Sequence, residues 1–333
     1  MTAVYAVLLF CILIFPHELG HFVAAKSVGV RVNEFALGMG PAIFKKQKGE
    51  TLYALRIIPI GGYCAMEGEN EESGDSRAFN NKPFWAKLIV LVAGSAMNVL
   101  ITILTLSILV GIAGVGTTVI DVVTPGSPAA EAGIRQGDKI SAINGKEIDS
   151  WGDLSTKITE NKKGDVLEIA INRDGSNHVV LATPEKSEDG RYLIGIKPVI
   201  KHNPFVAVAS GTKVTWSMTK MMFGGLKQII MGEASKDDIS GPVGIINLVS
   251  DTNQYGMGYF GYLVALISLN LAIINMLPLP ALDGGRILFV FIRKATGKMI
   301  SDDLEGKIHG FGMIMLIGLM LFITWNDITR LFL

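Results

Sequence analysis

The stretch LIVLVAGSAMNVLITILTLSILVGIAGVGTTVI, residues 88–120, decides the fold class, because it runs for thirty-three residues without a charged side chain. A helix needs about 20 apolar residues to cross roughly 30 Å of hydrocarbon. Residues 1–17, 252–282 and 310–326 also lack Asp, Glu, Lys and Arg, although the last run has only 17 residues, the short limit for a span. We therefore predict four membrane-spanning helices, and the alternative for the fourth run is a buried core helix.

The composition of the whole chain agrees with a membrane protein and excludes several other classes. Its mean hydropathy is +0.42 and 18% of its residues are charged, against about 25% in an average soluble domain. The 30 Lys and Arg balance the 30 Asp and Glu, so no basic field is present for nucleic acid, and we expect no nucleic-acid partner. Two cysteines cannot form a disulfide framework. The first uncharged run lacks a basic segment and a small-residue cleavage site, so we predict a span rather than a signal peptide.

The placement of Lys and Arg predicts the orientation of the spans. Positive residues near span ends gather on the cytoplasmic side. The chain has no basic residue before Lys26, and its last basic residue is Arg330. We therefore expect both termini outside, with spans one and three running in the same direction, from outside to inside. The basic residues between spans one and two are Lys26, Arg31, Lys45, Lys46, Lys48, Arg56, Arg77, Lys82 and Lys87, and those between spans three and four are Arg286, Arg293, Lys294, Lys298 and Lys307.

Residues from about 117 to 199 have the pattern of a soluble α+β domain inserted between spans two and three. Short β-rich runs are separated by Pro-Gly, Asn-Gly and Asp-Gly turns. Long domains cross the membrane largely regardless of charge, so we expect this insert outside. The expected strands are 118–123, 139–143, 166–172 and 178–183, and the expected helices are 127–134 and 150–161.

Residues 203–232 carry two stripes that repeat every seven residues. On a helix a basic stripe beside an apolar one is typical of a segment that lies in the membrane interface. Packing against the insert explains the same pattern almost as well. The stripes are Lys213, Lys220 and Lys227, and Trp216, Phe223 and Ile230.

The first span ends in the motif HELGH, residues 17–21. At positions i and i+4, His17 and His21 lie on one helical face, and Glu18 between them can reach a water on a metal held by that pair. A charged residue at mid-membrane costs about 2.5–3.5 kcal/mol, so such residues are rarely idle. The alternative is that the span ends before His17 and leaves the motif in an interfacial helix without a metal.

A catalytic zinc site needs a third protein ligand and an open position. Of the other histidines, His178 and His202 are expected outside, and His309 at the border of the fourth span is a weaker candidate. A better candidate is Asp283, in the motif NMLPLPALDGG, residues 275–285, where an acid, two prolines and two glycines close an uncharged run. Prolines remove helical hydrogen bonds, so we expect a broken or extended segment here, with an ordinary span end and exit turn as the alternative.

The depth of each motif in the bilayer indicates whether the two motifs can meet. At 1.5 Å per residue, His17 lies roughly 24 Å below an outer interface placed at Met1. By the same rule Asn275 lies about 27 Å below the interface if span three enters near Met257. Two parallel spans thus carry both motifs to the inner part of the bilayer.

Together, HELGH, NMLPLPALDGG and the intervening insert resemble the bacterial site-2 proteases of the RseP/RasP type, which are intramembrane zinc metalloproteases. The insert string SPAAEAGIRQGDKISAINGKEI, residues 127–148, resembles a bacterial PDZ domain, and mere spacing of the membrane parts is the alternative role. We find one such domain, whereas well-known enterobacterial members carry two. Further strings that agree are GMGP (38–41), GGY (61–63), GSAMN (94–98) and SGPVGI (240–245).

The resemblance implies a polytopic α-helical membrane protein with a membrane-re-entrant β-hairpin in about 33–65, where 33–37 and 51–58 alternate enough to pair. It implies that His17, His21 and Asp283 bind one zinc ion per chain and that Glu18 is the general base. It also implies that Asn275 and Asn270 hold the substrate backbone, and that Pro278 and Pro280 shape the broken segment. The expected domains are a membrane catalytic part (1–115 and 257–333), the PDZ domain (116–200) and interfacial helices or linker (201–256).

The function that the resemblance implies is zinc-dependent endoproteolysis within the bilayer. The expected substrates are single-span membrane proteins, such as anti-sigma factors, or signal-peptide remnants. The expected location is the bacterial cytoplasmic membrane, with the active site toward the cytoplasm and a PDZ domain outside that binds chain ends or filters by size. The alternatives are a non-proteolytic zinc-binding or transport protein and a membrane-anchored PDZ scaffold.

Overall fold

The computed structural model describes residues 2–69, 73–161, 164–187, 190–233, 241–297 and 302–332. The backbone forms two compact units, Met1–Leu109 with Gly211–Leu333, here called the helical unit, and Val110–Ser210, here called the insert. Among the described helices, four are long and apolar enough to span a membrane, which confirms the predicted number. They are Val4–Ser27 within α1 (Thr2–Ser27), Phe84–Ala113 (α2), Met257–Asn275 (α8) and Leu304–Thr329 within α10 (Asp302–Phe332).

All four helices have other bounds than their uncharged runs, and the differences in α1 and α2 matter for the fold. Helix α1 continues through Pro16 and the HELGH motif to Ser27, so the motif belongs to the same helix as the first candidate span and not to a separate helix. Helix α2 ends at Ala113, and Gly114 follows with a φ of 76°. The chain then enters strand β3 (Val115–Val123), where β-branched residues favour a strand. The last part of the uncharged run therefore belongs to a sheet.

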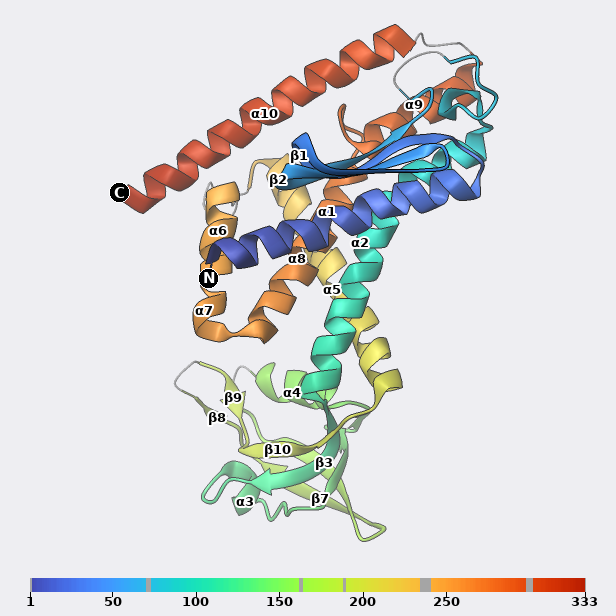
Figure 1. The fold of residues 1–333 in the computed structure, drawn as a ribbon. Coiled ribbons are helices and arrows are strands. Elements are labelled where there is room, and N and C mark those ends of the chain that lie inside the picture. Colours follow the sequence, from blue (N-terminus) through green and yellow to red (C-terminus); the bar gives the residue numbers. More distant parts are fainter. Residues whose placement is uncertain are drawn as a thin grey trace. The chain divides into compact units, whose positions relative to one another are not determined.

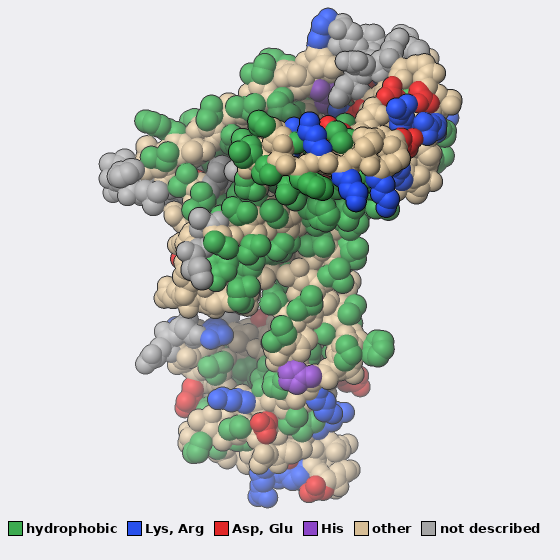
Figure 2. Space-filling model, in the orientation of Figure 1, with side chains coloured by type: hydrophobic (Ala, Val, Ile, Leu, Met, Phe, Trp, Pro, Cys, Tyr) green, Lys and Arg blue, Asp and Glu red, His purple; other side chains and the backbone are tan. Residues whose placement is uncertain are grey.

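The helical unit is built around α1, α2 and α8 (Figure 1). Leu9 and Leu13 of α1 share a buried apolar cluster with Leu263 and Val264 of α8. Polar contacts join α2 to α8, because the buried Ser268 Oγ donates to the Asn98 carbonyl at 3.0 Å. Figure 2 shows hydrophobic side chains over much of the visible face of this unit, as expected for a surface that meets lipid.

The first loop forms a long hairpin of β1 (Val32–Lys48) and β2 (Thr51–Met66), which extends both predicted strands. Four residues of β1 are paired with two separate segments of β2. Residues 34–37 pair with 52–55 and also with 62–65. Within the described residues, 62–65 pair with no other strand, so they form an outer edge of the sheet. This edge lies next to α1, which contacts β2.

The insert contains a six-stranded antiparallel sheet with the strand order β10-β3-β4-β6-β7, in which β5 pairs with β4, and a two-stranded antiparallel sheet of β8 and β9. Its core is formed by buried aliphatic side chains such as Ile120, Ile140, Leu154, Ile169 and Ile171. Helix α3 is capped by Ser127 and α4 by Ser150, at the positions where the sequence predicts helix starts. The remaining elements are α3 (Pro128–Glu131), β4 (Lys139–Ile143), β5 (Lys146–Glu147), α4 (Trp151–Thr159), β6 (Leu167–Arg173), β7 (Ser176–Ala182), β8 (Glu185–Lys186), β9 (Tyr192–Leu193) and β10 (Ile196–Lys201).

The predicted amphipathic segment is one helix, α5 (Pro204–Met231). Its side chains Met218 and Met222 pack against Leu106 of α2 and Leu269 of α8, while Trp216 is 62% exposed. One side of α5 therefore belongs to the helical unit. The other described elements are η1 (Phe79–Asn81), α6 (Pro242–Ser250), α7 (Thr252–Tyr255) and α9 (Asp283–Thr296).

Candidate active site

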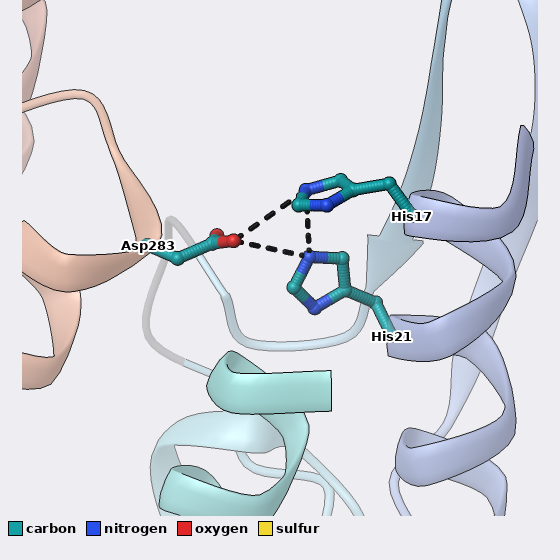
Figure 3. A group of neighbouring side chains, drawn as sticks. All are labelled: His17, His21 and Asp283. Carbon is teal, nitrogen blue, oxygen red and sulfur yellow. Dashed lines mark hydrogen bonds and ion pairs between the residues drawn. The ribbon is translucent and has the colours of Figure 1, made fainter. Parts of the chain in front are cut away.

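His17 and His21 of α1 and Asp283 at the start of α9 point toward one another (Figure 3). Their ligand atoms all lie within 4.8 Å of one another. Asp283 Oδ2 is 3.5 Å from His17 Nε2 and 3.3 Å from His21 Nε2. Both imidazoles are buried, with 8% and 7% of their surface exposed. Residues 266 positions apart in the sequence thus converge on one point inside the helical unit.

The orientation of His21 is set by α2. His21 Nδ1 lies 2.8 Å from the Val90 carbonyl oxygen, which can only accept, so Nδ1 carries the proton and donates it. The Nε2 lone pair is thereby left for a metal. Gly94 of α2 makes room for the two rings, because a Cβ there would lie 2.3 Å from His21 Nε2 and 2.7 Å from His17 Cε1.

Two asparagine amides contact His17. Asn98 Nδ2 lies 3.4 Å from His17 Nδ1, and Asn275 Nδ2 lies 3.3 Å from His17 Nε2. Asn98 is fully buried, and its Oδ1 has no hydrogen-bond partner among the described residues. With the Asn98 amide turned by 180°, its oxygen accepts from His17 Nδ1–H, and His17 Nε2 is left unprotonated.

The break after α8 brings Asp283 to the histidines. Helix α8 ends at Asn275, and the chain runs irregularly through two prolines before α9 begins at Asp283, as the prolines predict. Gly284 allows this tight return, because a Cβ there would lie 2.2 Å from the Leu277 carbonyl oxygen. Asp283 sits in the first turn of α9, where the helix dipole favours a carboxylate.

The donor set fits a catalytic zinc ion. Zinc sites of this type use three nitrogen or oxygen ligands and keep a fourth position open. Asp283 Oδ2 is buried and lacks a hydrogen-bond partner within the described part of the chain. A buried, unpartnered carboxylate oxygen facing two imidazoles is costly on its own, and a cation between them removes this cost.

Glu18 faces a cavity of about 520 Å³ beside the two histidines and Asp283. On one side the cavity is lined by the edge strand of β2, from Tyr63 to Met66. The Glu18 carboxylate faces the backbone of Cys64 in that strand. The Glu18 carboxylate, the three candidate metal ligands and the edge strand of β2 therefore surround one cavity. The cavity lining is His17, Glu18, His21, Tyr63, Cys64, Ala65, Met66, Glu69, Leu91, Asn275, Ala281, Leu282, Asp283 and Arg286.

Other residues predicted for the site lie farther from it. Asn270 is exposed on α8 and is not among the described residues that line the cavity, whereas Asn275 is. Pro278 is exposed, and Pro280 packs against Gly312 of α10. The role of Asn270 and of the two prolines in substrate binding stays a prediction.

The remaining histidines lie outside the ligand group. His309 bonds the backbone of Ala281, and within the insert His178 is exposed while His202 contacts the Gly111 carbonyl. Asn98 and Gly94 contribute to the site, but neither was predicted as a site residue. The signal was a glycine and an amide, the seventh and eleventh residues of an uncharged run, where polar side chains are rare.

Known proteins match this chain over nearly its whole length. The chain matches the model of Peptidase family M50 over residues 5–319. It is 37% identical to a protein of Clostridium acetobutylicum over 98% of this chain and 96% of that one. It is 30% identical to the regulator of sigma-W protease RasP of Bacillus subtilis (100% and 99% covered) and 31% identical to the zinc metalloprotease RasP of Geobacillus kaustophilus (98% and 97%).

Among solved structures, the PDZ domain of the SdrC-like protein from Listeria monocytogenes is 26% identical, with a TM-score of 0.23 over 26% of this chain and 87% of that one. The assignment of the whole chain to a family rests on the family match and on the relatives that cover its full length. The described part of the chain contains four candidate membrane spans and a group of two histidines and an aspartate that could hold a metal ion. The chain therefore belongs to Peptidase family M50 and is a membrane zinc metalloprotease.

Proposed function

We propose that this protease hydrolyses peptide bonds within the bilayer, in the membrane-spanning segments of single-span proteins. The observation that carries the proposal is the position of the ligand group, since His17, His21 and Asp283 lie between helices that are apolar and long enough to span a membrane. A secreted or cytoplasmic protease does not need a metal site between membrane-spanning helices. A bound substrate therefore reaches the site from the lipid phase.

We propose that one zinc ion per chain is held by His17, His21 and Asp283. When bound, it polarises the scissile carbonyl and stabilises the negative charge that develops on its oxygen. Glu18 takes the proton of the attacking water and later gives it to the leaving amine. Asn275, beside His17 and within the cavity, donates its amide hydrogens to the substrate backbone. Asn270 is the second proposed backbone contact, and Pro278 and Pro280 keep the segment before Asp283 irregular.

The edge strand of β2 is the proposed docking edge for the substrate. The peptide groups of a membrane helix are hydrogen-bonded within that helix, so the helix must unwind before one of its peptide bonds can be attacked. Residues 62–65 have one side without a paired strand within the described residues, and Tyr63, Cys64 and Ala65 line the cavity with Glu18. An unwound substrate can add to this edge by main-chain hydrogen bonds, which hold it extended beside the base.

We propose that both termini and the insert lie outside the cytoplasmic membrane, with the site toward the cytoplasm, because Lys and Arg gather in the loops after spans one and three. The insert has a groove of about 250 Å³ between α4 and the segment from Leu193 to Lys197. It is the proposed site for the chain end of a substrate that was trimmed outside. The relative from Bacillus subtilis is named as a regulator of sigma-W, which makes anti-sigma factors the first substrates to test, followed by signal-peptide remnants.

The proposed function is tested by replacing Glu18 with Gln, which keeps the shape of the side chain and removes the base. Cells co-expressing a tagged single-span substrate should accumulate it uncut, with cleavage reduced at least about 100-fold, because general-base catalysis contributes that much. The purified variant should still bind one zinc ion, measured by elemental analysis.

The same variant separates the other candidate functions. Unchanged cleavage by Glu18→Gln would refute the proteolytic role of this residue. A transport protein would keep its zinc flux in this variant, and a scaffold would show no change in any output. Retained zinc together with lost cleavage is expected of a protease alone.

A further inference from the structure

His309 of α10 holds the backbone next to the ligand group. Its Nδ1 accepts a hydrogen bond of 2.8 Å from the backbone N–H of Ala281, two residues before Asp283. We propose that His309 is a positioning residue, which orients Asp283 for metal binding by fixing the turn at Ala281. This inference rests on the proposed zinc site and adds the fourth span to the parts that build it.

The turn at Ala281 needs such support. Ala281 has a φ of 73°, in the left-handed region that residues with a Cβ avoid, and it is one of three described non-glycine residues with positive φ. A strained backbone persists only where its surroundings hold it. The bond from Ala281 N–H to His309 Nδ1 is the contact that holds it from outside the segment.

Helix α10 also packs closely against Pro280, the residue before Ala281. A Cβ at Gly312 would lie 2.3 Å from Pro280 Cβ and 2.8 Å from the Pro280 carbonyl carbon. Gly312 is three residues beyond His309, so both positions lie on one face of the helix. This face therefore contacts the chain at two consecutive residues, Pro280 by packing and Ala281 by a hydrogen bond.

The imidazole of His309 is itself held in one orientation. Its side chain is 13% exposed, and its ring lies 5.6 Å from that of Phe289 on α9. Because Nδ1 accepts, the proton is on Nε2, which lies 3.8 Å from Glu305 Oε1. Glu305 in turn accepts from Arg293 of α9 at 2.6 Å. The ring is thus packed against α9 with its accepting nitrogen directed at Ala281.

The acceptor position gives a test with a matched pair of variants. In His309→Asn the carbonyl oxygen takes the place of Nδ1, whereas in His309→Gln it takes the place of Nε2, which points away from Ala281. Both carry the same amide, and the one additional methylene group of Gln moves the acceptor from the place of Nδ1 to that of Nε2. Phe311→Leu, at a 70% exposed position of the same helix, is the control for changes in α10.

The first measurement is hydrogen–deuterium exchange of peptides that cover residues 277–285, on full-length protein in detergent after removal of metal. We expect faster exchange in His309→Gln, and exchange like wild type in His309→Asn and Phe311→Leu. The second measurement is zinc retention against a competing chelator, where we expect His309→Gln to lose about 10-fold in affinity, the loss typical of groups that orient a ligand. Wild-type elution as a single species in size-exclusion chromatography checks the fold of each variant.

The results distinguish this inference from the proposed zinc site. Equal exchange and equal zinc affinity in the Asn and Gln variants would overturn the positioning role, because the place of the acceptor would not matter. Wild-type protein that binds no zinc would overturn the proposed site, whatever the exchange data show. A loss of zinc affinity with unchanged exchange at 277–285 would also contradict the role assigned to the Ala281 bond.

Discussion

At the scale of single residues, Gly94 shows how closely α2 approaches the ligand group. Replacing it with Ala should favour the helix, since Gly in a helix interior costs roughly 0.5–1 kcal/mol relative to Ala. The added Cβ would nevertheless lie 2.3 Å from His21 Nε2 and displace the ring. We expect Gly94→Ala to lose zinc and to reduce cleavage at least about 100-fold, as loss of the metal-bound geometry removes the main catalytic group.

Zinc content and substrate cleavage measure this outcome. Gly224→Ala is the matched control, because a Cβ at this helical position would meet nothing within 4 Å. Wild-type zinc content in Gly94→Ala would contradict the assignment of the site to this crossing of α1 and α2.

At the scale of elements, the ion pair of Asp138 and Arg173 ties the strand β6 to the turn before β4. The Arg173 guanidinium donates to both carboxylate oxygens of Asp138 at 2.7 Å, and Asp138 is 1% exposed. These bonds lower the pKa of Asp138 below its ordinary value of 3.8. A lowered folded-state pKa contributes stability that is complete above the unfolded pKa and is lost as the pH falls through the folded one.

The insert should therefore lose stability in acid below about pH 4, where unfolded Asp titrates. Asp138→Asn should destabilise the insert by about 2 kcal/mol at neutral pH and flatten this acid dependence. Denaturant unfolding of the full chain measures both effects by the fluorescence of Trp151, in a background where Trp85, Trp216 and Trp325 are replaced by Phe. Asp174→Asn, at an exposed turn, is the control, and an equally steep acid loss in Asp138→Asn would contradict the account.

At the scale of the whole molecule, the orientation of the chain is the proposal that most needs a test. In a background with both cysteines, Cys11 and Cys64, replaced by Ser, single cysteines at the exposed positions Ser176 and Gly74 report on the insert and on the first loop. A membrane-impermeant maleimide added to intact spheroplasts should label Ser176→Cys. Gly74→Cys should be labelled only after lysis, because the basic first loop is expected in the cytoplasm.

The reverse labelling pattern would place the insert in the cytoplasm and remove its proposed role in capturing trimmed substrates. Labelling of both positions in intact spheroplasts would mean that the first loop is not cytoplasmic. Either result leaves the geometry of the metal ligands unchanged, since that geometry depends only on the packing of α1, α2 and the break after α8.

Much of this molecule follows from local sequence pattern. Four apolar runs predict the four spans, because lipid has no partner for a free backbone group and a helix satisfies its own. The spacing of His17 and His21 puts both rings on one face of a helix. The prolines at 278 and 280 predict the break before Asp283. Strand and turn patterns also predict β3, β4, β6 and β7 of the insert, with ends that differ by at most three residues.

Only the tertiary structure decides the contacts between segments that lie far apart in the chain. Nothing local to Asn98 indicates that its amide faces His17, and nothing near His309 distinguishes a metal ligand from an acceptor for Ala281. The double register of the β1–β2 hairpin and its outer edge at 62–65 were likewise not predictable from alternation alone. The physical reason is that helical period and hydropathy are properties of neighbours in sequence, whereas hydrogen-bond partners across helices depend on how the packed elements are rotated and shifted against one another.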